Sequence, residues 1–257
     1  MGVKHKLGVV GKGILYSLSP KIHHHFAKDA GLDISYEVFD IDSQPIDFIE
    51  EFFELGGKGL NITKPFKEVV ASRFSDNLES ANCLSSKPIK AYTTDGEGLI
   101  NDLISKEIHF KGKNIMIFGL GGAGIAVANF LDKFSNVLLF NRSQTKIESM
   151  VKNNPSFSKY DGEKIDILIS CAKGLDVNAV DFFDSVNLAI DACIYDINYK
   201  NETNLLFQEL EKVKPENLFT GEGMLVEQAA LSFKIWFNNA PKTCLLYTSD
   251  AADDWSS

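Results

Sequence analysis

The sequence NIMIFGLGGAGIAVANFL, residues 114–131, decides the fold expected for the second half of this chain. Its first part, from Ile115 to Gly119, is a short apolar run of the kind that forms a buried strand. A cluster of glycines follows, and from Ile125 to Phe134 the apolar residues recur at helical spacing. Val137 to Phe140 is a second apolar run. Strand, helix and strand in this order predict a βαβ unit, whose two strands lie parallel in one sheet.

Further apolar runs on both sides of this unit continue the alternation of strands and helices. Residues 166–170 and 188–190 can add strands to the same sheet. The first half has its own pattern, with strands expected at 7–11, at 36–41 and from residue 59, and helices ending at residue 30 and spanning 46–55. Charged residues interrupt the apolar pattern between 98 and 112. The sequence therefore predicts the α/β class, with two α/β domains that join in this region.

The composition indicates a compact globular protein. The chain has 257 residues, more than one domain usually contains, and 44% of them are hydrophobic. Its 35 acidic side chains outnumber its 26 basic ones, and the resulting net charge of -9 disfavours binding to the phosphate backbone of nucleic acids. No stretch reaches the ~18 apolar residues of a membrane span. We therefore expect a cytosolic protein with neither nucleic acid nor membrane as a partner.

The cysteine and histidine residues do not follow a metal-binding pattern. His23, His24 and His25 fall in an expected helix, where consecutive side chains point in different directions and form no common metal-binding face. We expect them to be ordinary helix residues, and we expect no metal. The cysteines have no CxxC spacing, which predicts buried free thiols. They are Cys83, Cys171, Cys193 and Cys244.

The glycine cluster has the spacing of a dinucleotide-binding turn. Gly119, Gly121 and Gly124 satisfy the GxGxxG pattern, directly after a strand and at the start of a helix. In such a turn the first glycine allows the tight bend, the second lets the backbone approach a pyrophosphate, and the third allows close packing of helix and strand. The partial positive charge of the helix N-terminus favours the bound phosphates.

The residues after the second strand of this unit distinguish the two nicotinamide cofactors. A site for NAD usually has an acidic residue there, about 20 residues beyond the glycines, to bind the ribose 2′-hydroxyl group. This chain has Asn141, Arg142 and Ser143 instead. The guanidinium group of Arg142 can pair with a 2′-phosphate, assisted by Ser143 and Lys146. The sequence therefore favours NADP(H) over NAD(H).

Polar residues that follow strands in the first half are candidates for substrate binding. Ser17 and Ser19 lie after the first expected strand, at the edge where open α/β sheets bind ligands, and their hydroxyl groups could hold a carboxylate. A turn or helix cap would explain them equally well. Asn61 and Thr63 close the third strand, and Lys67 is expected in the first turn of a helix that starts at the preceding proline. Lysine is disfavoured at a helix N-terminus, so its presence there points to a function, although an ordinary surface lysine is the more common explanation for any single lysine.

Six stretches, in this order and at compatible spacing, resemble the shikimate dehydrogenase family. They are SLSP (17–20), NITKPFK (61–67), SAN (80–82), TTDG (93–96), the glycine-rich turn (119–124) and GEGMLVEQ (221–228). The resemblance covers residues 8 to about 238. It implies a reversible, NADPH-dependent reduction of 3-dehydroshikimate to shikimate in the chorismate pathway of aromatic amino acid biosynthesis. A quinate or dual quinate/shikimate dehydrogenase, and a dinucleotide-sensing regulator without catalysis, are the alternatives.

The resemblance also implies roles for individual residues. Lys67 and Asp95 would be the catalytic pair, with Lys67 as the proton donor that reduction of a ketone by hydride requires. Substrate contacts would come from Ser17, Ser19, Asn61, Thr63, Asn82, Tyr195 and Gln228. Cofactor contacts would come from Gly119, Gly121, Gly122, Ala123, Gly124, Asn141, Arg142, Ser143, Lys146 and Gly221.

The same resemblance predicts how the chain is divided. Residues 1–100 would form the substrate-binding catalytic domain, completed by a C-terminal helix at 222–240 that returns to it, and residues 101–221 the Rossmann-type NADP domain. The active site would lie in the cleft between the two. Residues 242–257 lack a sustained helical pattern and are expected to be a non-native tail. The expected binding partner is the small-molecule substrate. We expect the protein to be a monomer or a homodimer.

Overall fold

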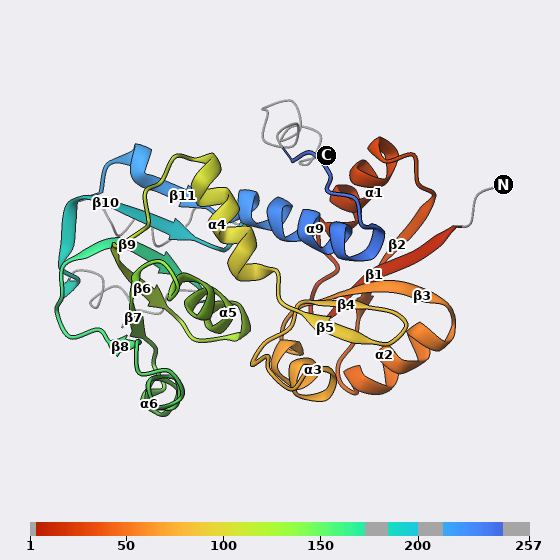
Figure 1. The fold of residues 1–257 in the computed structure, drawn as a ribbon, viewed down its shortest axis with the longest axis horizontal. Coiled ribbons are helices and arrows are strands. Elements are labelled where there is room, and N and C mark those ends of the chain that lie inside the picture. Colours follow the sequence, from red (N-terminus) through yellow and green to blue (C-terminus); the bar gives the residue numbers. More distant parts are fainter. Residues whose placement is uncertain (1–3, 173–184, 200–212, 244–257) are drawn as a thin grey trace. The chain divides into compact units, whose positions relative to one another are not determined.

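The structure, a computed structural model, describes residues 4–172, 185–199 and 213–243. The chain divides into two compact units, residues 1–98 with 225–257 as unit 1 and residues 99–224 as unit 2. Figure 1 shows both as sheets covered by helices. The boundaries expected from the sequence were 100/101 and 221/222. The expected tail from Cys244 onward, and with it that cysteine, lies outside the described residues.

Unit 1 is built on a five-stranded sheet with the strand order β2-β1-β3-β4-β5. β1 is parallel to both β2 and β3, whereas β4 pairs antiparallel with β3 and with β5. The sequence pattern did not predict the β4–β5 hairpin, because its strands are too short to show a period. The elements are β1 (His5–Gly11), α1 (Ser19–Asp29), β2 (Ile34–Asp40), α2 (Pro45–Glu54), β3 (Gly57–Ile62), α3 (Lys67–Phe74), β4 (Cys83–Ser85) and β5 (Lys90–Tyr92).

Both faces of this sheet are buried. Leu7 and Val9 of β1 join a cluster with residues of α1 and of α9 (Glu222–Phe237), while Val10 joins a second cluster that includes residues of α2 and α3. Successive strand residues point to opposite faces, so one strand contributes to both clusters. Residues 225–237 of α9 belong to unit 1.

Unit 2 contains a six-stranded parallel sheet with the order β11-β10-β9-β6-β7-β8. Counted along the unit from β6, this is the 3-2-1-4-5-6 order of a Rossmann fold. From β6, one set of strands is added toward one edge of the sheet (β7, β8) and the next set toward the other edge (β9, β10, β11). Such sheets bind ligands at the point between β6 and β9 where the strand order changes direction. The elements are α4 (Asp95–Ser105), which starts in unit 1, β6 (Asn114–Phe118), α5 (Gly122–Leu131), β7 (Asn136–Phe140), α6 (Gln144–Asn153), β8 (Ser158–Lys159), β9 (Ile165–Ser170), β10 (Leu188–Asp196), the short helix η1 (Pro215–Asn217) and β11 (Leu218–Thr220).

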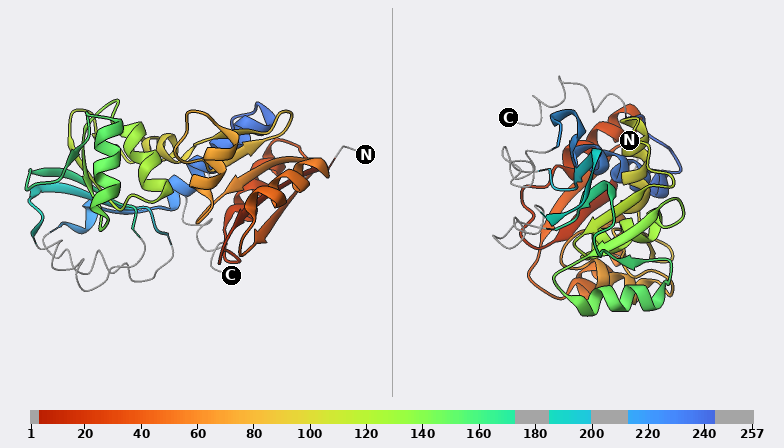
Figure 2. Two further views of the ribbon diagram at one scale, coloured as in Figure 1. Left: turned by 90° about the horizontal axis from the view of Figure 1, so that it is seen from below. Right: turned by 90° about the vertical axis from the view of Figure 1, so that its left-hand side faces the viewer.

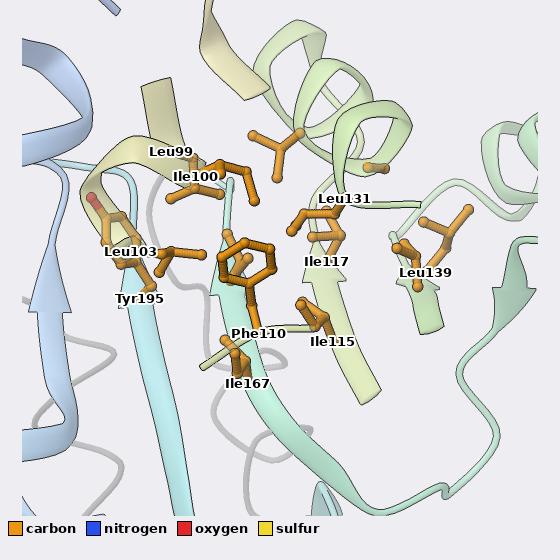
Figure 3. Close-up of a cluster of buried hydrophobic side chains, with 14 of the residues drawn as sticks. Leu99, Ile100, Leu103, Phe110, Ile115, Ile117, Leu131, Leu139, Ile167 and Tyr195 are labelled. Atoms are coloured by element: carbon orange, nitrogen blue, oxygen red, sulfur yellow. The ribbon is translucent and has the colours of Figure 1, made fainter. Parts of the chain in front are cut away.

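The core of unit 2 follows the same alternation. Ile115 and Ile117 of β6 face a cluster that includes residues of α4 and α5, and Figure 3 shows them around the ring of Phe110. Met116 and Phe118 face a second cluster on the other side of the sheet. In the left view of Figure 2, the strands of each unit form one twisted sheet with helices packed against it.

None of the helices in the described part of the chain has the length and apolar character that a membrane span requires. Of the cysteines in that part, Cys83 and Cys193 are buried and Cys171 is partly exposed, and all are free thiols. Burial raises the pKa of both Cys83 and Cys193 to about 12, so these two sulfur atoms stay protonated at neutral pH.

Candidate active site and dinucleotide site

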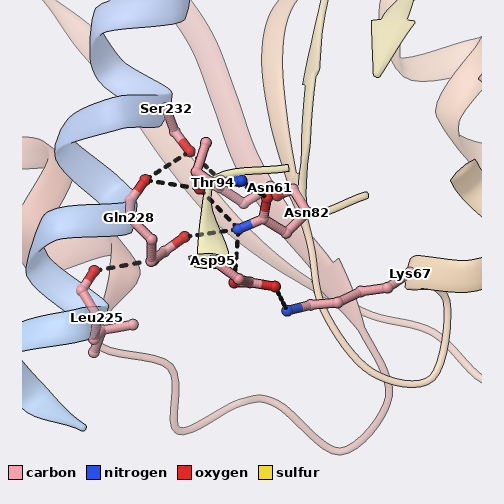
Figure 4. A network of polar contacts seen from close by, with 8 residues as sticks. All are labelled: Asn61, Lys67, Asn82, Thr94, Asp95, Leu225, Gln228 and Ser232. Carbon is pink, nitrogen blue, oxygen red and sulfur yellow. Dashed lines mark hydrogen bonds and ion pairs between the residues drawn. The ribbon is translucent and has the colours of Figure 1, made fainter. Parts of the chain in front are cut away.

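Lys67 and Asp95 form an ion pair in unit 1 (Figure 4). Lys67 Nζ donates to Asp95 Oδ2 at 2.5 Å, and the two side chains are 14% and 5% exposed. Lys67 is the first residue of α3 and Asp95 the first residue of α4. The expectation that α3 starts at Pro65 was wrong by two residues, since residues 64–66 form a turn before the helix. The turn brings Lys67 to the helix terminus itself.

The positions of these two charges at helix N-termini have opposite energetic consequences. A carboxylate at a helix N-terminus is stabilised by the helix dipole, whereas an ammonium group there is destabilised, each by roughly 0.3–1 kcal/mol. The contact of Lys67 with Asp95 therefore offsets the unfavourable position of the ammonium group. The pair is accessible at the lysine end, where a ligand oxygen could accept a proton.

Asn82 holds Asp95 in place from the other side. Asn82 Nδ2 donates to Asp95 Oδ1 at 2.9 Å and to Thr94 Oγ1 at 2.8 Å. In return the backbone N–H of Thr94 donates to Asn82 Oδ1 at 2.7 Å. These residues are all less than 5% exposed. Because one carboxylate oxygen of Asp95 binds Asn82 and the other binds Lys67, the carboxylate has a single orientation.

Helix α9 closes this network through Gln228. Gln228 Oε1 accepts a hydrogen bond from Asn82 Nδ2 at 3.2 Å, and Gln228 Nε2 donates to the Leu225 carbonyl at 3.0 Å. The Gln228 carbonyl accepts from Thr94 Oγ1 at 3.1 Å and from Ser232 Oγ at 3.0 Å. The fold thus joins residues as far apart in the sequence as Asn61 and Ser232 in one set of hydrogen bonds (Figure 4).

Asn61 is a buried part of this network. Asn61 Nδ2 donates to the Asn82 carbonyl at 3.2 Å and to Ser232 Oγ at 2.9 Å. Asn61 Oδ1 accepts from the Tyr36 hydroxyl at 2.8 Å. Both amide hydrogens are therefore used inside the protein, which leaves the carbonyl oxygen as the atom with remaining capacity for a ligand.

The serines predicted to hold a carboxylate lie together at the start of α1. Ser17 Oγ donates to Ser19 Oγ at 3.1 Å and accepts from the Ser19 backbone N–H at 3.3 Å. The preceding loop is fixed by Asp40, whose carboxylate accepts from the backbone N–H groups of Gly13 at 2.8 Å and Ile14 at 2.9 Å. Thr63, directly after β3, is half-buried and donates its backbone N–H to Val10.

The close approach of α4 to α9 depends on Gly98. A Cβ atom at Gly98 would lie 2.8 Å from the backbone nitrogen and 3.0 Å from the Cα of Gln228. We expect Gly98→Ala to push Gln228 away from Asn82, to lower the free energy of unfolding by about 1–3 kcal/mol and to raise the substrate KM about tenfold. Urea unfolding and steady-state kinetics test this, with Glu97→Ala, exposed on the same helix, as the control. Wild-type kinetics in Gly98→Ala would contradict it.

In unit 2, the glycine-rich turn has the shape that a dinucleotide requires. Gly119 has φ of 98°, a left-handed conformation that favours glycine, and a Cβ at Gly124 would lie 2.0 Å from the Gly119 carbonyl oxygen. A Cβ at Gly121 would meet no atom within 4 Å, so the backbone there is open to a ligand. Gly121 is the N-cap of α5, whose first N–H groups face outward along the helix axis. The turn therefore fits a pyrophosphate.

The residues after β7 support this turn and add positive charge. Asn141 Oδ1 accepts from the backbone N–H of Leu120 at 3.0 Å, so Asn141 fixes the turn from inside. Lys146 Nζ donates to the Leu120 carbonyl at 3.2 Å. Arg142 is exposed, and Ser143 Oγ lies 2.8 Å from Thr145 Oγ1. No acidic residue stands between Phe140 and Ile147, which fits a 2′-phosphate better than a free hydroxyl group.

Two predicted site residues have clear packing roles in unit 2. Tyr195 of β10 is fully buried and its hydroxyl donates to Asp102 Oδ2 at 2.5 Å, and Figure 3 shows its ring among core side chains. Its position in the strand directs the side chain to the core face, where the hydroxyl group is occupied by Asp102 and not directed toward a ligand. A Cβ at Gly221 would lie 2.1 Å from the Ile197 carbonyl oxygen, which explains a glycine there by packing alone.

Sequence reasoning missed Tyr36, Thr94 and Ser232. Thr94 belongs to the TTDG stretch, and its position beside Asp95 was a usable signal. Tyr36 lies in a strand pattern and Ser232 in an apolar helix, where a single polar residue looks unremarkable. Their partners are 25 and 171 positions away in the sequence, so only the folded chain brings them to Asn61.

Comparison with known proteins gives matches in both the first and the last part of the chain. Residues 9–84 match the family model of the shikimate dehydrogenase substrate binding domain, and residues 221–243 match that of the shikimate 5′-dehydrogenase C-terminal domain. The NADP(+)-dependent shikimate dehydrogenase of Chromobacterium violaceum is 32% identical over 93% of this chain and 94% of its own length. That of Pyrococcus abyssi is 30% identical over 93% of this chain and 94% of its own length.

Solved structures give the same result. The shikimate dehydrogenase of Aquifex aeolicus superimposes with a TM-score of 0.83 at 27% identity, covering 98% of this chain and 97% of that one. A shikimate dehydrogenase in complex with NADP+ superimposes with a TM-score of 0.83 at 29% identity, covering 99% and 97%. The matches therefore span both units of the fold.

Proposed function

The chain belongs to the shikimate dehydrogenase family, and from this membership we propose that it catalyses the reversible NADPH-dependent reduction of 3-dehydroshikimate to shikimate in the chorismate pathway. The observation that carries the proposal is the ion pair of Lys67 and Asp95 at 2.5 Å, held by a network of amide side chains. A scaffold that binds a dinucleotide without catalysis has no need for such a pair. The pair needs neither metal nor covalent chemistry to act.

In the proposed mechanism Lys67 is the general acid. NADPH, when bound, supplies the hydride that adds to the substrate's carbonyl carbon. As the carbonyl double bond becomes a single bond, negative charge develops on its oxygen. The Lys67 ammonium group donates a proton to that oxygen. The product is a hydroxyl group, and the neutral lysine regains a proton from solvent. In the opposite direction, the neutral amine accepts the hydroxyl proton.

Asp95 is proposed to orient Lys67 and a substrate hydroxyl group. Its Oδ2 holds the ammonium group at 2.5 Å, and Asn82 fixes its other oxygen at 2.9 Å. Holding a proton donor in one position is worth several kcal/mol of barrier, because its orientation is settled before reaction. Asn82, Gln228, Asn61 and Thr63 would contact the hydroxyl groups of the ring.

The substrate carboxylate is proposed to bind at Ser17 and Ser19. The two hydroxyl groups lie 3.1 Å apart and each can rotate to donate to a carboxylate oxygen. When a carboxylate binds, the hydrogen bond between the serines would be exchanged for two charge-assisted ones, which are stronger.

The cofactor is proposed to lie on the glycine-rich turn of unit 2. The backbone of Gly121, Gly122 and Ala123 at the start of α5 would bind the pyrophosphate, and Arg142, Ser143 and Lys146 the 2′-phosphate. Asn141 would contribute by holding the turn, as its hydrogen bond to Leu120 indicates.

The test of this function is NADPH oxidation measured with 3-dehydroshikimate and, separately, with 3-dehydroquinate. Activity with the first alone supports the proposal. Activity with 3-dehydroquinate alone or with both would indicate a quinate or dual enzyme, in which the ring bears one more hydroxyl group. Binding of NADPH without oxidation of either would indicate a regulator.

Arg142 is expected to set the cofactor preference. Arg142→Ala should raise the KM for NADPH roughly tenfold to a hundredfold, because it removes a charge-assisted pair with the 2′-phosphate, and should leave the KM for NADH nearly unchanged. Initial rates with each cofactor at saturating substrate measure this. Equal losses with both cofactors would mean that Arg142 supports the fold of unit 2 and does not select the nucleotide.

The cytosolic location and the monomeric or dimeric state stay predictions from the sequence. Fractionation of cells that express the protein and sedimentation of the purified protein would test them.

A further inference from the structure

Tyr36 lies beneath the proposed substrate-binding residues and was not part of the predicted site. It belongs to β2 and is 5% exposed. Its hydroxyl donates to Asn61 Oδ1 at 2.8 Å and also interacts with Ser19. Burial raises the pKa of Tyr36 well above its usual value, and the Ser19 contact opposes this in part. The hydroxyl group therefore stays protonated and serves as a donor.

The ring of Tyr36 is held on several sides by aromatic groups of unit 1. It stacks on His23 with the ring centroids 4.5 Å apart and an interplanar angle of 10°. Trp236 lies 6.5 Å away at 44°. His23 is itself fully buried and contacts Trp236 at 5.1 Å. Packing at this density restricts the ring to one position, so its hydroxyl group has a fixed direction.

A fixed donor determines how the Asn61 amide group is turned. The Tyr36 hydroxyl donates to the amide oxygen, so this oxygen faces the ring and the amide nitrogen faces the other way. That nitrogen then donates to the Asn82 carbonyl at 3.2 Å and to Ser232 Oγ at 2.9 Å. Asn82 in turn holds Asp95. A chain of buried hydrogen bonds thus leads from Tyr36 to the Lys67–Asp95 pair.

We propose that Tyr36 is a positioning residue for substrate binding, which acts by orienting the Asn61 amide group and, through it, the Asn82 segment. This inference rests on the proposed function. Tyr36 is buried and makes its polar contacts with Asn61 and Ser19, so its effect is on how well the site is formed before substrate arrives. Loss of its hydroxyl group leaves Asn61 Oδ1 without its buried donor, and the amide group is then held only through its nitrogen, by the Asn82 carbonyl and Ser232.

The test is Tyr36→Phe, which keeps the ring stack and removes only the hydroxyl group. We expect the KM for 3-dehydroshikimate to rise about tenfold with kcat within about threefold, and the KM for NADPH to stay unchanged because the cofactor site belongs to unit 2. Tyr160→Phe is the matched control. Tyr160 is also a buried tyrosine, its hydroxyl accepts from the Asn187 backbone N–H at 3.0 Å, and it lies in unit 2.

A double-mutant cycle shows whether the effect passes through Asn61. In an Asn61→Ser background, Tyr36→Phe should change the KM for 3-dehydroshikimate less than twofold, because the amide group on which it acts is gone. Additive effects, or a wild-type KM in Tyr36→Phe, would overturn the proposal. A wild-type enzyme that does not reduce 3-dehydroshikimate would instead overturn the proposed function, so the two failures are distinct.

Discussion

Lys67→Ala is expected to lower kcat by about 10²–10⁴, which corresponds to roughly 3–5 kcal/mol of barrier. The reason is that the ammonium group is proposed to donate its proton as charge develops on the carbonyl oxygen. That interaction exists only in the transition state, so the KM for 3-dehydroshikimate should change no more than a few-fold. Steady-state kinetics in both directions measure it, with circular dichroism as the check on folding.

Lys64→Ala is the matched control for this variant. Lys64 lies three positions earlier, and its Nζ donates to the Tyr16 hydroxyl at 3.0 Å at the surface of the protein. Because its ammonium group is engaged in this exposed contact, we expect Lys64 to lie outside the set of groups that bind the substrate. We expect nearly wild-type rates. If Lys64→Ala is the impaired variant, or if Lys67→Ala retains full turnover, the catalytic assignment is wrong even though the family assignment stands.

The βαβ unit and the cofactor turn could be predicted because their signals are local. The strand from Ile115, the glycines and the helix that follows are consecutive in the sequence. The left-handed φ of Gly119 is a property of a single residue, which glycine adopts readily. The absence of an acidic residue between Phe140 and Ile147 is likewise a local feature of the sequence. Each of these features can be predicted from about 30 consecutive residues.

The support of the proposed active site could not be predicted, because its parts are distant in the sequence. Asn61 meets Ser232 across 171 positions, and Asn82 meets Gln228 across 146. The β4–β5 hairpin that carries Cys83 next to Asn82 has strands of only three residues, too short for a periodic pattern. Sequence motifs identified several members of the network, but only the fold shows which atoms they bind and that Asn61 has no amide hydrogen to spare.

Acid is expected to destabilise unit 1 through His23. This side chain is fully buried among aromatic rings, and neither ring nitrogen has a hydrogen-bond partner among the described residues. Burial lowers the pKa of His23 to about 3 from an ordinary value of 6.5, with the nearby His24 acting in the same direction and the Asn61 side chain opposing it. The unfolded chain therefore binds one more proton than the folded chain between about pH 6.5 and pH 3.

The sign of the effect follows from this difference. Above pH 6.5 His23 is neutral in both states and contributes no pH dependence, whereas below it each pH unit costs about 1.4 kcal/mol of unfolding free energy. His23→Phe keeps a flat ring against Tyr36 and removes the titration. Between pH 7 and pH 4, the unfolding free energy of the wild type should therefore fall by about 3 kcal/mol more than that of the variant. Any overpacking by the larger ring shifts the variant equally at every pH.

Urea unfolding at a series of pH values measures this difference, followed by tryptophan fluorescence, since Trp236 lies 5.1 Å from His23. Taking wild type minus variant at each pH cancels the titration of the carboxylates, which both proteins share. His24→Gln is the control, because His24 is exposed on the same helix and is only the smallest of the contributions to the pKa of His23, so its replacement should change the pH dependence far less than His23→Phe does. Parallel curves for the wild type and His23→Phe would mean that His23 takes up its proton in the folded protein about as easily as in the unfolded chain. The aromatic packing around it would then have to open in acid without loss of the fold.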